Sequence, residues 1–461
     1  MKKLELLIKK AKIDQKKLQY NYDQKKIINC YKSIALSLIN NKTNLKYSTI
    51  AVKETGFGSI QDKIIKNYRK TFGLLTDLEN TITFGINKKK DINSQYEFIK
   101  PVGVLVCFVP STNPIATLLN YVINSIATRN SVIISPSPKS FELTVKIIKK
   151  IRLILNKHNL PKNIVQTLDI KPNFKIRDFL LNNCDKSIIT GNKSNILAGK
   201  RSNKISLGVG VGNVVSIVCK DININSTIDK IIKSVTFDNG TSCSSENFIF
   251  FSKLKYYQIV KNIEKKGGYF LDDLEKEKLL NSHWNKNELN IGSIGKSAED
   301  ILNLAGIKKR TKSIVKFLLI KSKYKDKNKK IIGEKLSPIV SYYFTDDLDK
   351  IIDFTNYIYN FAGEGHSIGI HTHNKTNILK VLSKINTSRL IINQSHCFAT
   401  GGSFENTLPF SLSMSCGSWQ NNYSNNNLNW KDYCNITTIS NKITNYENEF
   451  QNIFKGIKIY D

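Results

Sequence analysis

The segment at residues 101–110, PVGVLVCFVP, is the part of the sequence that most restricts the fold. It is a continuous apolar run of strand length, rich in β-branched residues, which is typical of a strand buried on both faces. Ser, Thr and Asn precede a proline at residues 111–114, which is a helix-start signal, and an apolar helix is predicted at 115–128. A strand at 131–135 and a helix at 141–158 follow. This alternation at crossover spacing predicts an α/β fold with a parallel, doubly wound sheet.

The alternation continues towards the C-terminus. No internal repeat or low-complexity linker interrupts it, although residues 321–330 form a charged surface loop. The sequence therefore predicts consecutive α/β units along the chain. Further strands are predicted at residues 164–170, 187–190, 205–219 and 314–320, and a further helix at residues 177–183.

Residues 1–72 carry apolar side chains at helical spacing, as in Ile27, Tyr31 and Ile34. An Asn-rich stretch at residues 40–44 is read as a break. The pattern predicts a lead-in of two or three helices.

The formal net charge of +33 would ordinarily suggest a nucleic-acid partner. Here the lysines are spread along all 461 residues together with abundant Asn and Ile, a composition that AT-rich codon usage alone produces. A nucleic-acid footprint requires the charge to gather in one stripe. We therefore expect no nucleic-acid partner, and two or three structural units at this length.

The eight cysteines are scattered, and none forms a C-x-x-C pair or lies near a histidine at zinc spacing. We expect neither disulfides nor a metal site. No run approaches roughly 20 consecutive apolar residues, and the Lys-rich start has no signal-peptide core. The sequence predicts a cytoplasmic protein without membrane contact or targeting peptide.

The segment at residues 206–213, SLGVGVGN, invites interpretation as a dinucleotide fingerprint. A true fingerprint opens a helix, whereas residues 214–219 read as another strand. The glycines are therefore predicted to form a tight turn between strands, close to a ligand.

Cys243 is the sharpest signal for chemistry. It lies in TFDNGTSCSSEN, residues 236–247, between an amphipathic helix and a strand. Its small polar neighbours leave the sulfur accessible to a substrate and a cofactor. By contrast, we interpret Cys30, Cys107 and Cys184, as well as Cys219, as small buried hydrophobic residues.

Residues 237–246 resemble the nucleophile motif of the aldehyde dehydrogenase superfamily, and specifically of its CoA-acylating branch. Other segments resemble the family in the same order along nearly the full chain. Those segments are ETGFG (54–58), DKIIKN (62–67), PVGVLVCFVPSTNP (101–114), SPSPKS (135–140), TGN (190–192), GVGVGN (208–213), EKLSP (334–338), GEGHS (363–367) and MSCGSWQNN (414–422).

The resemblance implies a Rossmann-like NAD(P)-binding domain at residues 1–206 with a hairpin arm near 85–98. It further implies a catalytic domain at 207–400 that carries Cys243, a C-terminal return and oligomerisation segment at 401–461, and a homodimer or homotetramer. NAD and NADP both stay open, because Ser137 and Lys139 suit either ribose. The cofactor-binding residues that the resemblance implies are Pro110, Ser111, Thr112, Ser135, Ser137, Lys139, Thr190, Gly191, Gly208, Glu334 and Leu336.

The resemblance also implies a mechanism. Cys243 attacks the aldehyde carbonyl, and the Asn113 amide with the Cys243 backbone N–H holds the oxyanion. Hydride leaves for the nicotinamide, and a thioester remains on the enzyme. Hydrolytic members carry a glutamate at the start of the glycine loop, where this chain has Ser206, so we expect transfer to coenzyme A instead of water. His366 is either an aid to proton transfer or a structural histidine.

The substrate funnel of the family draws on residues 393–410, which here resemble sulfoacetaldehyde-oxidising acylating enzymes more than acetaldehyde enzymes. His396 and Thr400 offer donors to a sulfonate, although the same residues suit an ordinary polar turn. Sulfoacetaldehyde and acetaldehyde both stay open as substrates. A hydrolytic aldehyde dehydrogenase is the first alternative. A noncatalytic homologue or a basic nucleic-acid-binding protein is the second, and retention of Cys243, Asn113 and Glu334 together speaks against a noncatalytic homologue.

Overall fold

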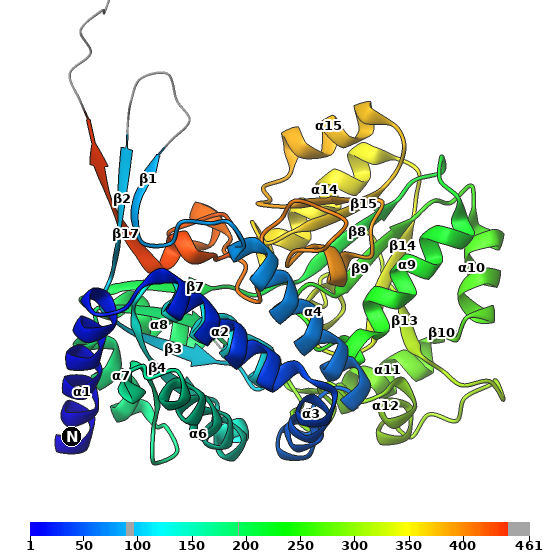
Figure 1. Cartoon of the computed structure of the whole chain (residues 1–461). Helices are drawn as coiled ribbons and strands as arrows, with labels where there is room; N and C mark the ends of the chain where they lie inside the picture. Colours follow the sequence, from blue (N-terminus) through cyan, green and yellow to red (C-terminus); the bar gives the residue numbers. More distant parts are fainter. Residues whose placement is uncertain (89–95, 192, 441–461) are drawn as a thin grey trace, which may run out of the picture.

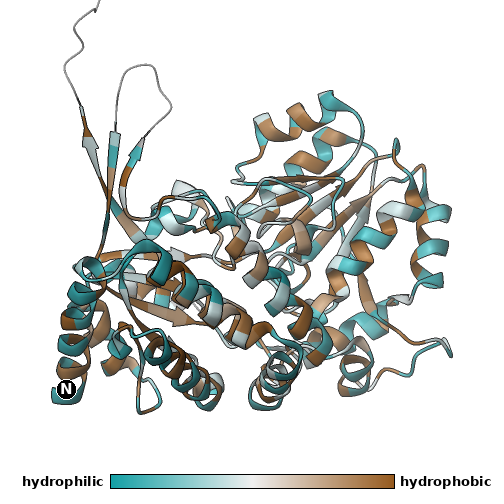
Figure 2. Ribbon diagram, in the orientation of Figure 1, coloured by the Kyte–Doolittle hydropathy of each residue, from teal (hydrophilic) through white to brown (hydrophobic). Residues whose placement is uncertain are grey.

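The computed structural model describes residues 1–88, 96–191 and 193–440 (Figure 1). Two parallel sheets, each covered by helices on both faces, are joined to a three-stranded antiparallel arm. The α/β class predicted from the sequence is confirmed. In Figure 2 the strands inside both halves are largely coloured as hydrophobic, and the hydrophilic colour gathers on the outer faces of the helices.

The first sheet contains the strands around residues 101–110. Successive side chains of its central strand point to opposite faces. Leu105 and Val109 face the core formed with α2 (Gln24–Ile39), α5 (Pro114–Ala127) and α6 (Phe141–Lys157), whereas Val104 and Val106 face α1 (Lys2–Tyr20) and α7 (Phe174–Asn183). All four are buried, which explains the unbroken apolar run. The strand order is β5 (Val165–Thr167), β4 (Ser131–Pro136), β3 (Val104–Val109), β6 (Lys186–Thr190) and β7 (Ile205–Val209).

Helices of the first half follow the sequence pattern closely. Pro114 begins α5 at its first position, where its missing N–H costs nothing. These helices are α5 (Pro114–Ala127), α6 (Phe141–Lys157), α7 (Phe174–Asn183) and α8 (Lys193–Arg201).

The lead-in contains four helices, so the prediction of two or three was wrong. The Asn-rich stretch is a start signal as well as a break: the Asn40 side chain accepts a hydrogen bond from the Thr43 N–H and caps the third helix. Ser59 caps the fourth helix in the same way. The four are α1 (Lys2–Tyr20), α2 (Gln24–Ile39), α3 (Asn41–Thr55) and α4 (Ile60–Leu78).

The second sheet has seven parallel strands. Helices α9 and α10 cover one face, and α11, α12, α14 and α15 cover the other. The strand order is β10 (Gly268–Phe270), β13 (Phe317–Lys321), β14 (Ile339–Phe344), β9 (Glu246–Phe251), β8 (Val214–Val218), β15 (Ile368–His371) and β16 (Leu390–Ile392). The helices are α9 (Ile224–Thr236), α10 (Tyr256–Lys265), α11 (Asp273–His283), α12 (Ala298–Leu304), α13 (Lys329–Ile332), α14 (Leu348–Phe361), α15 (Lys375–Lys384) and α16 (His396–Ala399).

The arm consists of β1 (Gly85–Lys88), β2 (Tyr96–Pro101) and β17 (Cys434–Ile439), paired antiparallel in that order. Figure 1 shows it projecting from the body of the molecule. Pro101 ends β2, so the run at 101–110 is divided: Gly103, with φ 133°, turns the chain before β3 begins at Val104. A short hairpin, β11 (Trp284–Asn285) with β12 (Glu288–Leu289), completes the strands.

No helix within the described ranges is long and apolar enough to cross a membrane. All eight cysteines are free.

Candidate active site

Cys243 lies in a turn between α9 and β9. The chain leaves α9 through a 3-10 turn, η3 (Phe237–Gly240), in which Asp238 and Asn239 adopt left-handed backbone angles (φ 53° and 52°). Asp and Asn tolerate this conformation better than most residues. The small residues that follow bring Cys243 to the boundary between two cavities, and it lines both of them.

The glycine segment at 208–213 supports this turn. It joins β7 of the first sheet to β8 of the second, and no helix opens after it, so it is not a dinucleotide fingerprint. Gly212 lies against the backbone of Cys243, and a Cβ at Gly212 would overlap with the Cys243 carbonyl. Glycine is therefore required there for close approach.

The larger cavity, here called the outer cavity, lies at the carboxyl ends of β3, β4, β6 and β7 and has a volume of about 630 Å³. Open α/β sheets bind their ligands at this edge. The volume, and a lining that combines apolar residues with small polar ones, fit an extended cofactor such as NAD or NADP. Nine of the residues expected to bind the cofactor line it: Pro110, Ser111, Thr112, Ser135, Ser137, Thr190, Gly191, Glu334 and Leu336.

Two other residues expected to bind the cofactor do not line the outer cavity. The Lys139 ammonium lies 4.7 Å from the ring centre of Phe57. Gly208 is inside β7, and a Cβ there would press on Ile196 of α8, so this glycine serves helix packing. Asn192, the last residue of the TGN segment at 190–192, lies outside the described residues.

Glu334 and Leu336 occupy an unusual backbone segment. The Gly212 N–H donates to Glu334 Oε1 at 3.3 Å, and burial raises the pKa of this carboxyl to about 7. Leu336 has φ 47°, a conformation that costs a non-glycine residue about 1 kcal/mol or more. Its carbonyl accepts a hydrogen bond from the Gly295 N–H at 3.0 Å, which holds the segment in place.

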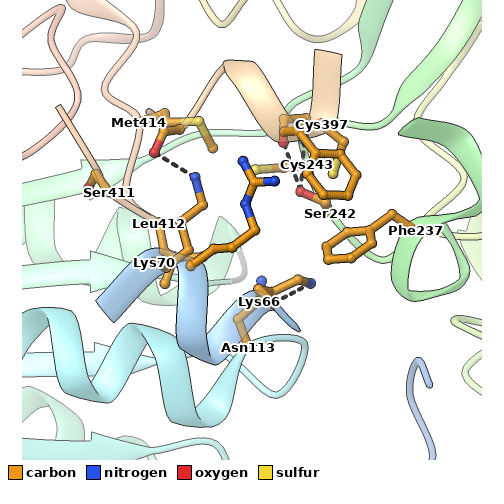
Figure 3. A pocket seen from close by; sticks show the side chains of 14 residues that line it. Lys66, Lys70, Asn113, Phe237, Ser242, Cys243, Cys397, Ser411, Leu412 and Met414 are labelled. Atoms are coloured by element: carbon orange, nitrogen blue, oxygen red, sulfur yellow. Dashed lines mark hydrogen bonds between the residues drawn. The ribbon is translucent and has the colours of Figure 1, made fainter. Parts of the chain in front are cut away.

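The smaller cavity, here called the inner cavity, lies on the other side of Cys243 and has a volume of about 40 Å³. That volume admits only a few small groups. In Figure 3, Ser242, Cys243 and Cys397 lie together on one side of this space, opposite Lys66 and Asn113.

Asn113 also lines both cavities. It precedes α5, yet its side chain makes no capping hydrogen bond. Its Oδ1 accepts a hydrogen bond from Lys66 Nζ at 2.7 Å, while its Nδ2 has only a long contact of 3.5 Å to Thr112 Oγ1. Lys66 therefore fixes the amide so that its N–H groups are available to a ligand.

Asp238 holds the Lys66 side chain in place. Its Oδ2 accepts from Lys66 Nζ at 2.5 Å and from Lys63 Nζ at 2.7 Å, and all three side chains are buried. Burial opposes ionisation of Asp238, but the two lysines outweigh it and lower the pKa of the carboxyl. Lys63 also donates to the Thr112 carbonyl at 2.6 Å. The segment 62–67 is therefore tied to the Cys243 turn through Asp238.

The Cys243 thiol is protonated at neutral pH. Burial is the largest cause and the negative charge of Glu334 the second, and together with other groups they raise its pKa to about 12. Its backbone N–H has no acceptor anywhere in the described part of the chain. A second hydrogen-bond donor is thus free beside the sulfur.

Three polar residues singled out in the sequence lie behind the site and line neither cavity. The buried His366 places Nδ1 2.8 Å from Ser367 Oγ. The buried His396 places Nδ1 2.9 Å from the Ser244 carbonyl and 3.0 Å from Thr400 Oγ1. His396 and Thr400 therefore hold the chain next to the nucleophile.

Five residues of the inner cavity were missed by the sequence reading. Lys66, Arg69 and Lys70 come from α4, and Phe237 and Phe398 form an aromatic pair with ring centres 4.4 Å apart. A signal existed, because positions separated by three and four residues share one face of a helix. The lysines were instead assigned to a diffuse surface charge.

Comparison with known proteins agrees with this geometry. Residues 51–405 match the model of the aldehyde dehydrogenase family. A sulfoacetaldehyde dehydrogenase (acylating) of Cupriavidus necator is 35% identical over 418 residues, covering 91% of this chain and 85% of that protein. A succinate-semialdehyde dehydrogenase (acetylating) of Clostridium kluyveri is 29% identical and covers 94% of each chain.

The crystal structure of an acetylating aldehyde dehydrogenase from Geobacillus thermoglucosidasius superposes with a TM-score of 0.91 at 26% identity, covering 97% of this chain and 98% of that one. The chain belongs to the aldehyde dehydrogenase family. Within that family it is a CoA-acylating member, which confirms the resemblance seen in the sequence motifs.

Proposed function

We propose that this enzyme oxidises sulfoacetaldehyde, with NAD(P)+ and coenzyme A, to the corresponding acyl-CoA through a thioester on Cys243. One observation carries the proposal: Cys243 and Asn113 lie where the two cavities meet, and both residues line both of them. An aldehyde in the inner cavity and a cofactor in the outer cavity can therefore reach the same sulfur.

In the first step the sulfur attacks the aldehyde carbon and the thiol proton passes to solvent, which is the proton released in the overall reaction. The carbonyl oxygen takes up the negative charge, for which the Asn113 amide and the Cys243 backbone N–H are the available donors. One such donor contributes about 3 kcal/mol to the transition state. The Lys66 ammonium on Asn113 Oδ1 polarises the amide and strengthens its N–H donors.

When bound in the outer cavity, the nicotinamide cofactor supplies the hydride acceptor that converts the adduct into a thioester. Glu334 lines that cavity, and we assign it to the nicotinamide ribose on the strength of the motif it belongs to. We assign the thiol of coenzyme A as the group that releases the product. The overall reaction is aldehyde, CoA and NAD(P)+ to acyl-CoA, NAD(P)H and a proton.

The lining of the cavities supports transfer to CoA over hydrolysis. Activation of water needs a general base. Among the described residues, none of those lining the inner cavity is a carboxylate, and Glu334 is the sole carboxylate of the outer one. Ser206, at the start of the glycine segment, lies in β7. Because Glu334 is assigned to the cofactor ribose, we infer that no carboxylate of the two linings is left to activate water at the thioester.

Two further assignments accompany the proposal. The free cysteines suit a reducing cytoplasm. Among the described residues, β1 and β17 are the edge strands of the antiparallel arm, and such edges suit pairing between copies in a homodimer or homotetramer. Light scattering on the purified protein tests the assembly, and a mass near one chain, 52.4 kDa, would contradict it.

The decisive experiment measures NAD(P)H formation by the purified enzyme with sulfoacetaldehyde and with acetaldehyde, each with and without CoA. We expect turnover only when CoA is present, with sulfoacetaldehyde preferred. Turnover without CoA would mean hydrolysis and would overturn the acylating mechanism for this substrate. Preference for acetaldehyde would overturn the substrate assignment alone.

A further inference from the structure

Three cations of α4 line the inner cavity, but two of them are already engaged. Lys66 Nζ donates to Asn113 and Asp238. Lys70 Nζ donates to the carbonyls of Gly401 and Gly402 at 2.6 and 3.1 Å. Neither has the freedom to turn towards a ligand without breaking these contacts.

Arg69 differs from both lysines. Its guanidinium lies 4.8 Å from the ring centre of Phe398, and it makes no hydrogen bond or ion pair with any residue that the structure describes. Glu405 acts on it only through space, and burial lowers the pKa of the group. A guanidinium has five N–H donors, and leaving them unsatisfied in a partly buried site is unfavourable.

The surroundings of Arg69 suit an anion. The inner cavity has three cationic side chains and, among the described residues, no carboxylate in its lining. A planar guanidinium matches the oxygens of a sulfonate or carboxylate with two parallel hydrogen bonds. The Phe398 ring, whose centre lies 4.8 Å from the guanidinium, favours the cation there.

The size of the cavity sets the length of the ligand. Arg69 and Cys243 line the same space of about 40 Å³. An aldehyde that reacts at the sulfur and also reaches the guanidinium must therefore be short.

We propose that Arg69 is the specificity-determining residue of the inner cavity, and that it binds the anionic substituent of a short aldehyde, a sulfonate or a carboxylate close to the carbonyl. The inference rests on the proposed function and deepens it, because it names the residue that separates charged from neutral substrates.

The test compares kcat/KM for sulfoacetaldehyde, malonate semialdehyde and the neutral tert-butylacetaldehyde, which has the shape of sulfoacetaldehyde without its charge. For Arg69→Met we expect the ratio of sulfoacetaldehyde to tert-butylacetaldehyde to fall by about 100-fold, the size expected for a lost charge-paired contact. Arg69→Lys keeps the positive charge but loses the planar guanidinium, so its ratio should lie between those of the wild type and Arg69→Met. Comparison of kcat/KM for malonate semialdehyde and sulfoacetaldehyde shows whether the cavity prefers a carboxylate or a sulfonate.

Lys233→Met is the matched control. The Lys233 ammonium also lies over the Phe398 ring, at 4.7 Å, but it is exposed and does not line the cavity. This variant should leave the ratio unchanged. An unchanged ratio in Arg69→Met, or an equal fall in Lys233→Met, overturns the inference.

A binding measurement separates the inference from the proposed function. Isothermal titration with isethionate, the unreactive alcohol analogue of sulfoacetaldehyde, should show binding to the wild type and at least tenfold weaker binding to Arg69→Met. Binding that depends on Arg69 without CoA-dependent turnover keeps the inference and removes the proposed function. Turnover of sulfoacetaldehyde without any dependence on Arg69 does the reverse.

Discussion

The outer and inner cavities meet at Cys243 but differ in how they use charge. The outer cavity is large and lined by strand ends with apolar and small polar residues. Its cation Arg177 is already paired with Asp178 at 2.7 Å and with Ser194 at 3.2 Å. The inner cavity is small and lined by three cations from one helix, of which Arg69 is unpaired in the described structure. Shape and backbone thus dominate the outer cavity on one side of Cys243, and positive charge dominates the inner cavity on the other side.

This difference teaches where specificity resides. A cofactor is recognised along its length by many weak contacts, and loss of one contact costs little. A short aldehyde has few atoms, so one charged contact decides between substrates. The following predictions test this division, from the largest expected effect to the smallest.

Cys243→Ala should abolish CoA-dependent NAD(P)H formation, with a loss of about 10⁴-fold or more, because no thioester forms. The matched control is Cys397→Ala, which removes a second thiol from the lining of the inner cavity. We expect this control to keep activity within about tenfold of the wild type. Equal loss in both variants would mean that the nucleophile is misassigned.

Alkylation of Cys243 by iodoacetamide should be slow and should keep rising with pH beyond pH 10. A thiol reacts as the thiolate, and a pKa raised from 9.0 to about 12 lowers the thiolate fraction at neutral pH by about 10³-fold. Mass spectrometry of the labelled peptide at several pH values measures this. A plateau near pH 8 would show that the thiol is activated before substrate binds.

Asn113→Ala should lower kcat by about 10²- to 10³-fold with little change in KM, since it removes a donor to the developing oxyanion. Lys66→Met should lower kcat by roughly tenfold, because the amide stays but is no longer held or polarised. Steady-state kinetics with excess CoA measures both. A larger loss in Lys66→Met than in Asn113→Ala would contradict the order of these roles.

Lys139→Ala should change the Kd for NAD and for NADP by no more than about twofold, since the side chain lies over Phe57 and outside the outer cavity. Fluorescence titration with each cofactor measures it. A selective loss of NADP affinity would place Lys139 at the ribose after all and would change the view of the outer cavity.

Local pattern was enough for the first sheet. The run around Val104–Val109 is apolar on both faces because the strand is covered on both, so its sequence shows its burial directly. The same holds for the helix that begins at Pro114. The number of lead-in helices was missed because Asn40 ends one helix and caps the next, and a single asparagine does not distinguish these roles.

Motif resemblance located Cys243, Asn113 and Glu334, and the structure brings all three to the lining of one cavity. It did not locate Arg69, because an arginine on a Lys-rich helix looks like solvent-facing charge. The motif resemblance also did not reveal that Gly208 packs against α8, since a glycine motif does not show which side chain lies against it.

The sequence by itself determined the α/β class and the family, and it predicted Cys243 as the nucleophile, because periodicity and short motifs are local properties of the chain. Only the tertiary structure decided that Asp238, after α9, holds Lys66 of α4 beneath Asn113 at the start of α5. Such a contact joins residues 172 positions apart, and no local pattern encodes it. Burial makes this contact energetically important, because a charged side chain removed from water must pair with another side chain that the fold brings near.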